Sequence, residues 1–101
     1  MNILFICNQS QNRSKTAEEL FRNRFETKSA GLYNDDPVTN QQLRWADTII
    51  VMEDAQRTEI AIRFPHIYLQ KRILCLGIPD IYRCNQPELV GALRTKMSEL
   101  L

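Results

Sequence analysis

Residues 3–17 read ILFICNQSQNRSKTA, an apolar run followed by a polar turn and then by a helical pattern. The continuous apolar run Ile3–Ile6 is typical of a strand that is buried on both faces of a parallel sheet. Beyond the turn, apolar residues recur with helical spacing from Ala17 to Phe25 and predict a helix over about 14–25. The stretch therefore predicts a strand, a turn and a helix, with Cys7 at the carboxyl end of the strand.

The same alternation continues along the chain. Further strands are predicted over 27–30, 48–52 and 73–76, where short apolar or β-favouring runs occur. Helices are predicted over about 36–45, where Asp36 and Pro37 form an N-cap and N1 pair, over about 54–64, ending before Pro65, and from about 85–87 onward.

The predicted order is β-α-β-α-β-α-β-α, which implies right-handed crossovers. We therefore expect one α/β domain over residues 1–101, with three layers: a four-stranded parallel sheet and helices on both of its faces. Ligands bind beyond the carboxyl ends of the strands in such a sheet. Cys7 follows the first strand and Asp80 follows the fourth, so both are expected to face one cleft.

Composition excludes several classes of function. The 101 residues include 13 Lys and Arg against 12 Asp and Glu, so no basic excess favours binding to nucleic acid or to a membrane surface. The chain has only three glycines, which rules out the glycine-rich dinucleotide motif and the P-loop. No apolar run is long enough for a membrane span, and the amino terminus lacks the features of a signal peptide.

The cysteines indicate a reducing compartment, and we expect a cytoplasmic protein. Cys7, Cys75 and Cys84 are odd in number and widely spaced, which argues against a disulfide framework. His66 is the sole histidine, and no local spacing supports a zinc site made from it and the cysteines. No metal site is therefore predicted.

The turn after the first strand has the character of an anion site. Arg13 and Lys15 fall in the first turn of the predicted helix, where the helix dipole disfavours positive side chains. An anion bound at the helix N-terminus would reverse that penalty, because backbone N–H groups and a guanidinium would both hold it. Positive charge at this place therefore favours a functional site over a neutral surface.

Cys7 and Arg13, six positions apart, suit the binding and transfer of a tetrahedral oxyanion. Arg13 can bind two oxygens at once, and the loop amides together with the helix dipole would favour the thiolate form of Cys7. Taken singly, a cysteine at a strand end is usually a small hydrophobe, and a serine such as Ser14 at a helix start is usually a cap. The joint pattern favours the oxyanion site. The loop residues between the two are Asn8, Gln9, Ser10, Gln11 and Asn12.

The motif Cys7-x5-Arg13-Ser14, followed by Thr16-Ala17-Glu18, resembles the signature of the low-molecular-weight protein tyrosine phosphatase family. Further segments match in the same order, at residues 29–31, 46–52 and 77–82. The resemblance covers nearly the whole chain and is closest to the short bacterial branch of that family.

The resemblance implies a cysteine-dependent phosphomonoesterase that uses a phosphocysteine intermediate and no metal or other cofactor. It makes Cys7 the nucleophile, Arg13 the phosphate-binding residue and Asp80 the general acid. It gives Ser14 the role of stabilising the thiolate and Ser29 that of bracing the phosphate loop. The implied substrate is a phosphotyrosyl protein or a small aryl phosphate, and Tyr82 and Tyr33 are candidates for an aromatic wall against its ring.

Two departures from the family pattern leave alternatives open. The family usually has asparagine in a left-handed conformation where Ser10 stands, and often glycine where Gln9 stands. The chain is therefore alternatively a catalytically weak module that binds phosphate or a phosphoprotein. A further alternative is arsenate reduction, which would need relay thiols. Cys84 lies nearer to the expected cleft than Cys75 does, so a redox role for Cys84 stays open.

Overall fold

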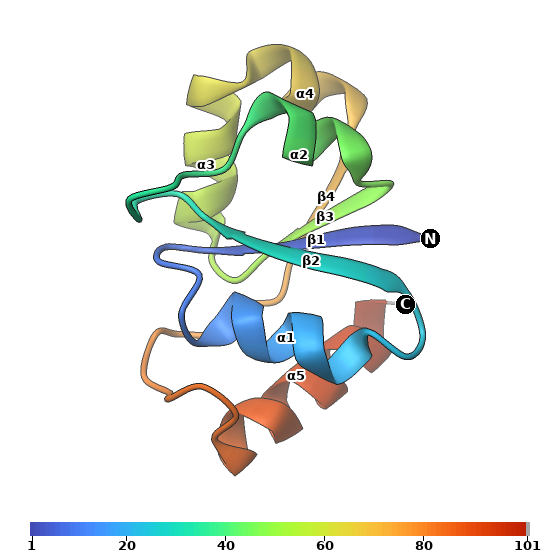
Figure 1. Ribbon diagram of the computed structural model, residues 1–101, viewed down its shortest axis with the longest axis vertical. Helices are drawn as coiled ribbons and strands as arrows, with labels where there is room; N and C mark the ends of the chain where they lie inside the picture. Colours follow the sequence, from blue (N-terminus) through green and yellow to red (C-terminus); the bar gives the residue numbers. More distant parts are fainter. Residues whose placement is uncertain (101) are drawn as a thin grey trace.

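The computed structural model describes residues 1–100 as a parallel sheet covered by helices on both faces (Figure 1). The strands are β1 (Asn2–Cys7), β2 (Glu26–Gly31), β3 (Thr48–Val51) and β4 (Arg72–Cys75). The helices are α1 (Arg13–Phe21), α2 (Asn40–Trp45), α3 (Asp54–Arg63), α4 (Pro65–Gln70) and α5 (Pro87–Leu100). All strand pairs are parallel, and the spatial order is β2-β1-β3-β4. The predicted fold class is confirmed.

The sheet separates two apolar cores. Helices α1 and α5 cover one face, whereas α2, α3 and α4 lie on the other (Figure 1). Ile3 and Phe5 of β1 belong to the core on the α1/α5 side, and Leu4 and Ile6 belong to the core on the opposite side. Burial on both faces explains why the strand reads as an unbroken apolar run. No helix within residues 1–100 is long and apolar enough to span a bilayer.

Helix α1 is shorter than its apolar pattern predicted. It ends at Phe21, and the backbone N–H groups of Arg24 and Phe25 both donate to the carbonyl oxygen of Phe21, at 3.0 and 3.1 Å. The chain turns there to enter β2. Phe25 still packs against the α1/α5 core, but it does so from outside the helix. The apolar spacing identified the buried face correctly and the end of the helix incorrectly.

The predicted start of the second helix at Asp36 and Pro37 was wrong. Thr39 is the N-cap of α2, where its Oγ1 accepts a hydrogen bond from the backbone N–H of Gln42 at 3.2 Å. The side-chain Oε1 of Gln42 in turn accepts from the backbone N–H of Thr39 at 2.9 Å. This reciprocal capping box satisfies two helix-end donors, which a cap at Asp36 would not do.

Helix α4 was not predicted. Pro65 ends α3 as expected, but it also occupies the first position of α4. A proline fits that position because its fixed φ suits the helix and no N–H is required there. The element order is therefore β-α-β-α-β-α-α-β-α. The remaining strand boundaries lie within one residue of the predicted ones.

Gly31 lies at a close approach between β2 and the turn that follows β1. It pairs in register with Cys7, and a Cβ atom built on it would lie 2.9 Å from the backbone oxygen of Asn8. The same Cβ would lie 2.9 Å from two side-chain atoms of Asn34. Because the Asn8 oxygen is part of the backbone, the clash cannot be relieved by a rotamer change.

We predict that Gly31→Ala lowers the free energy of unfolding by about 1–3 kcal/mol, since the added methyl group forces the backbone apart. Gly91→Ala is the matched control, because Gly91 lies in α5 and has nothing within 4 Å of its Cβ position. The control should raise the free energy of unfolding by about 0.8–1 kcal/mol through helix propensity. Urea denaturation of both variants measures the difference, and equal effects would contradict this account of Gly31.

Candidate active site

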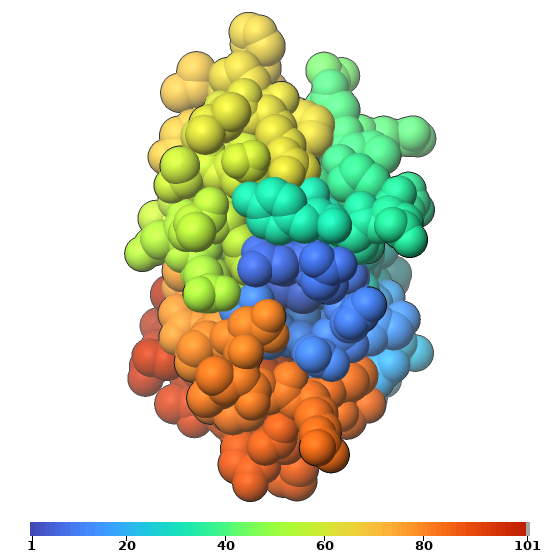
Figure 2. Space-filling view, turned by 90° about the vertical axis from the view of Figure 1, so that its left-hand side faces the viewer, coloured from blue at the N-terminus to red at the C-terminus, as the bar shows by residue number. Residues whose placement is uncertain are grey.

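The turn after β1 lies at the centre of the face formed by the carboxyl ends of the strands (Figure 2). The segment after β4, drawn in orange, borders it on one side, and the start of α3, drawn in yellow-green, borders it on another. A cleft of about 90 Å³ lies between this turn and the segment after β4, and it is lined by Cys7, Gln9, Gln11, Asn12, Arg13 and Asp80. The fold therefore places Cys7, Arg13 and Asp80 around one small space.

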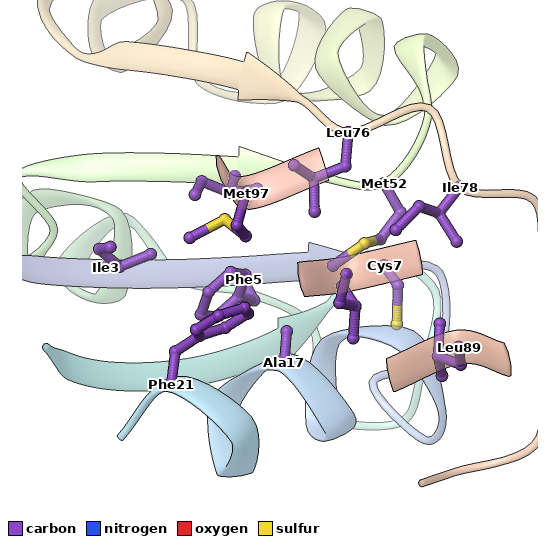
Figure 3. Packing of buried hydrophobic residues seen from close by; sticks show 12 residues of the cluster. Ile3, Phe5, Cys7, Ala17, Phe21, Met52, Leu76, Ile78, Leu89 and Met97 are labelled. Atoms are coloured by element: carbon purple, nitrogen blue, oxygen red, sulfur yellow. The ribbon is translucent and has the colours of Figure 1, made fainter. Parts of the chain in front are cut away.

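The thiol of Cys7 is surrounded by hydrogen-bond donors. Its side chain projects from the end of β1 on the side of the sheet that α1 covers (Figure 3), and only 3% of the residue is exposed. The backbone N–H of Ser10 donates to Sγ at 3.1 Å, and the Ser14 hydroxyl lies 3.0 Å from the same sulfur. When the sulfur is ionised, the hydroxyl must be the donor. This environment differs from that of a cysteine that only fills apolar space.

Ser10 adopts a left-handed backbone conformation. Its φ is 57°, a value at which asparagine is more frequent than serine. This conformation accompanies the hydrogen bond from the Ser10 N–H to the Cys7 sulfur, and the Ser14 hydroxyl also lies 3.3 Å from the Ser10 hydroxyl. Serine therefore takes up the left-handed conformation at this position, next to the Cys7 sulfur.

Contacts from the segment after β2 and from α3 fix the first residue of the loop. The backbone oxygen of Asn8 accepts hydrogen bonds from the N–H groups of Leu32 and Tyr33, both at 2.9 Å. The Asn8 side-chain oxygen accepts from Nε2 of Gln56 at 3.1 Å. Gln56 is almost completely buried, and its Oε1 also accepts from the N–H groups of Met52 and Glu53. Gln56, which was not predicted from the sequence, therefore ties the start of α3 to the loop.

Arg13 is 1% exposed and is held in one orientation by its partners. Its Nη1 donates to Oε1 of Glu53 at 2.5 Å and to the carbonyl oxygen of Ile78 at 2.8 Å. Its Nε lies 3.8 Å from Oδ1 of Asp80. The arginine therefore connects α1 with the segments that follow β3 and β4.

Glu53 was not among the site residues predicted from the sequence. The residue follows β3 and forms the N-cap of α3, at the carboxyl edge of the sheet where Cys7 and Asp80 also lie. Its position in the sequence, directly after a predicted strand, could have identified Glu53 as a site residue, because polar residues that follow parallel strands converge at this edge. The pairing with Arg13 depends on how three loops approach one another.

Asp80 lines the cleft, but its side chain is 55% exposed. The segment that carries it is anchored on both sides. Before it, the N–H of Ile78 donates to the carbonyl oxygen of Met52 at 2.8 Å. After it, the N–H of Asn85 donates to Oγ1 of the buried Thr16 at 2.8 Å. The carboxyl group is thus reachable by water while its backbone is held against the core.

Three of the side chains predicted to serve this site lie elsewhere. The Ser29 hydroxyl donates to Oε1 of Glu18 at 2.6 Å, so it braces α1 and not the loop. Tyr33 is exposed and lies beneath the guanidinium of Arg63, 5.0 Å from it. Tyr82 packs against the α1/α5 core. Neither tyrosine lines the cleft, which therefore lacks the expected aromatic wall.

The other two cysteines lie outside the cleft. Cys84 is exposed, and the hydroxyl of Thr16 donates to its sulfur at 3.6 Å. Cys75 ends β4 on the far side of β3 from β1, and desolvation by burial raises the pKa of its thiol. A thiol with a raised pKa is largely protonated near neutral pH, which makes it a poor nucleophile.

No model of a protein family matches the sequence, and the comparison with curated proteins finds no match. Solved structures do match. The tyrosine phosphatase AmsI from Erwinia amylovora is similar with a TM-score of 0.80 and 19% identity, over 97% of this chain and 89% of its own. The tyrosine phosphatase Wzb from Escherichia coli K30, in complex with phosphate, is similar with a TM-score of 0.77 and 21% identity, over 98% and 94%.

A third neighbour carries a different activity in its name. The YwlE arginine phosphatase from Geobacillus stearothermophilus is similar with a TM-score of 0.68 and 21% identity, over 98% of this chain and 84% of its own. These likenesses extend over almost the whole length of each protein. They confirm the expected resemblance at the level of architecture: the chain has the fold shared by the low-molecular-weight tyrosine phosphatases and the YwlE arginine phosphatases.

Proposed function

We propose that this protein is a cysteine-dependent phosphatase that transfers a phosphoryl group first to Cys7 and then to water. The observation that carries the proposal is the position of the Cys7 sulfur at the cleft, where a backbone N–H and the Ser14 hydroxyl can donate to it. Such donors stabilise a thiolate, which is the reactive form of cysteine. The fold neighbours, which are phosphatases, support the same reading.

Arg13 is positioned to hold the transferring group. Its Nη1 is already taken by Glu53 and by the Ile78 carbonyl, whereas no hydrogen bond within residues 1–100 uses Nε or Nη2. These two nitrogens can donate to two oxygens of a phosphoryl group. Glu53 thus fixes the guanidinium from behind, and the N-terminal end of α1 adds the positive end of a helix dipole.

In the first step the Cys7 thiolate attacks phosphorus, so that a P–S bond forms as the bond to the leaving oxygen breaks. Asp80 gives its proton to that oxygen. In the second step the Asp80 carboxylate accepts a proton from water as the water oxygen attacks phosphorus and the P–S bond breaks. The products are inorganic phosphate and the free thiolate. In a YwlE mutant with cysteine replaced by serine, the active-site serine is phosphorylated, which supports a phosphorylated enzyme on this fold.

A phosphotyrosyl side chain or a small aryl phosphate is the substrate class that we propose, as for the tyrosine phosphatases of this fold. The cleft is lined by amide side chains and by no tyrosine, so ring stacking does not define it. Cys7 must remain reduced to act, which fits a cytoplasmic location. We propose that residues 1–101 form one catalytic domain.

We predict that Cys7→Ser lowers kcat for p-nitrophenyl phosphate by about 10³-fold or more, because a serine hydroxyl is far less ionised than a thiol. Cys84→Ser is the matched control and should hydrolyse the ester at the rate of the unaltered protein, since Cys84 lies outside the cleft. Equal rates for Cys7→Ser and the unaltered protein would contradict the proposed nucleophile.

Asp80→Asn should lower kcat by about 10²-fold for an ester with a poor leaving group, and by much less for p-nitrophenyl phosphate, whose leaving group needs little protonation. Asp36→Asn, in the exposed loop before α2, serves as the control. The measurement is kcat against leaving-group basicity. If kcat depends on leaving-group basicity in the same way in Asp80→Asn as in the unaltered protein, Asp80 is not the general acid.

The alternative function, binding of phosphate without turnover, makes a different prediction. Both functions require that inorganic phosphate or vanadate raises Tm. At a ligand concentration of 100 times Kd, binding adds about 2.7 kcal/mol to the free energy of unfolding. Arg13→Lys should reduce that shift, because lysine cannot bind two oxygens in a fixed geometry. A normal shift in the unaltered protein together with background hydrolysis would identify a binding module. No shift at all would contradict both functions.

A further inference from the structure

A second cavity of about 300 Å³ lies on the opposite side of the sheet from α1 and α5. It is formed where α2 faces the corner between α3 and α4, and these three helices group together in Figure 1. No residue of the proposed active site lines it. Its volume is more than three times that of the catalytic cleft and reaches the range of small-molecule sites.

The cavity combines an apolar base with two arginines and other polar side chains. Phe64 is half-buried and Ile67 is buried, and both pack with the core on this side of the sheet. Arg44, Arg63 and His66 also line the space, and no aspartate or glutamate does. A cavity with this lining favours a ligand that is apolar at one end and negatively charged at the other.

Arg63 is held rigidly. Its Nε donates to Oε2 of Glu59 at 3.1 Å, and its Nη1 donates to the carbonyl oxygen of Leu32 at 2.6 Å. Its guanidinium also lies over the ring of Tyr33. Glu59 largely neutralises this arginine, so Arg63 serves as a fixed wall with one remaining donor nitrogen.

Arg44 carries a charge that no carboxylate balances. Its Nε donates to the side-chain oxygen of Asn40 at 3.3 Å, which orients the guanidinium, and no acidic group within residues 1–100 lies within ion-pair distance of it. Lys71 adds a further cation near the end of α2, where its Nζ donates to the carbonyl oxygens of Arg44 and Ala46. An oriented guanidinium without an acidic partner, at the edge of a cavity whose base is apolar, is suited to a planar carboxylate.

We propose that this cavity is a binding site for a small aromatic carboxylate, whose ring lies against Phe64 and Ile67 while its carboxylate pairs with Arg44. The guanidinium can donate two parallel hydrogen bonds to a carboxylate. The ring would cover the part of half-buried Phe64 that water now contacts. The site is separate from the catalytic cleft, so this proposal does not depend on the proposed phosphatase activity.

The test uses 2-naphthoate as the probe and the full chain labelled with ¹⁵N. We expect amide shift changes centred on residues 40–44 and 63–70, with a dissociation constant on the order of 1 mM or lower, as for a ligand of about a dozen non-hydrogen atoms. Arg44→Gln should weaken binding by about 10-fold or more, and Arg44→Lys, which keeps the charge without the fork, by less. Arg94→Gln, an exposed arginine of α5 far from the cavity, should bind as the unaltered protein does.

The neutral analogue 2-naphthalenemethanol separates charge recognition from simple ring burial. Equal affinity for the alcohol and the acid would overturn the proposal, as would equal affinity in Arg44→Gln with Tm unchanged. Shift changes centred on residues 7–13 and 80 would assign the acid to the catalytic cleft and would also overturn it. So would the absence of any shift up to about 10 mM. The test measures binding alone and does not require that the protein hydrolyse p-nitrophenyl phosphate.

Discussion

Arg13 is almost completely buried, and its guanidinium joins three segments that are distant in sequence. It begins α1, it pairs with Glu53 after β3, and it donates to the carbonyl oxygen of Ile78 after β4. A buried guanidinium without such partners would cost about 3–5 kcal/mol. The loops at the carboxyl edge of the sheet must therefore converge on this residue for the chain to fold stably, and their convergence creates the cleft.

The same constraint explains how one group can serve both structure and chemistry. Glu53 and Ile78 occupy a single nitrogen of Arg13, which leaves the rest of the guanidinium for a ligand at the cleft. The Cys7 sulfur has an equivalent arrangement, because Ser10 and Ser14 fix its position while it still borders the cleft. Donors that are already in place do not need to reorganise when negative charge develops, which would favour the proposed phosphoryl transfer.

Cations are distributed unevenly over the two faces of the protein. Near the cleft, the charge of Arg13 is balanced by Glu53 and approached by Asp80. On the α2, α3 and α4 side, Arg63 has a partner in Glu59, but Arg44 has none among residues 1–100. The net charge of +1 therefore does not show where positive charge lacks a partner. The arginine at the cleft is paired with a carboxylate, whereas Arg44 at the second cavity is not.

The amino-acid sequence by itself determined the layers of the fold and the place of Cys7, Arg13 and Asp80, because burial on both faces of β1 and the helical apolar spacing are local patterns. The resemblance to the phosphatase family, which usually has a left-handed asparagine at position 10, left the backbone conformation of Ser10 open, and the structure shows a φ of 57° there. Local patterns did not reveal α4, the start of α2 at Thr39, or the positions of Ser29, Tyr33 and Tyr82. Only the tertiary structure decided that Glu53 meets Arg13, since that contact joins residues 40 positions apart and depends on how three loops approach one another in space.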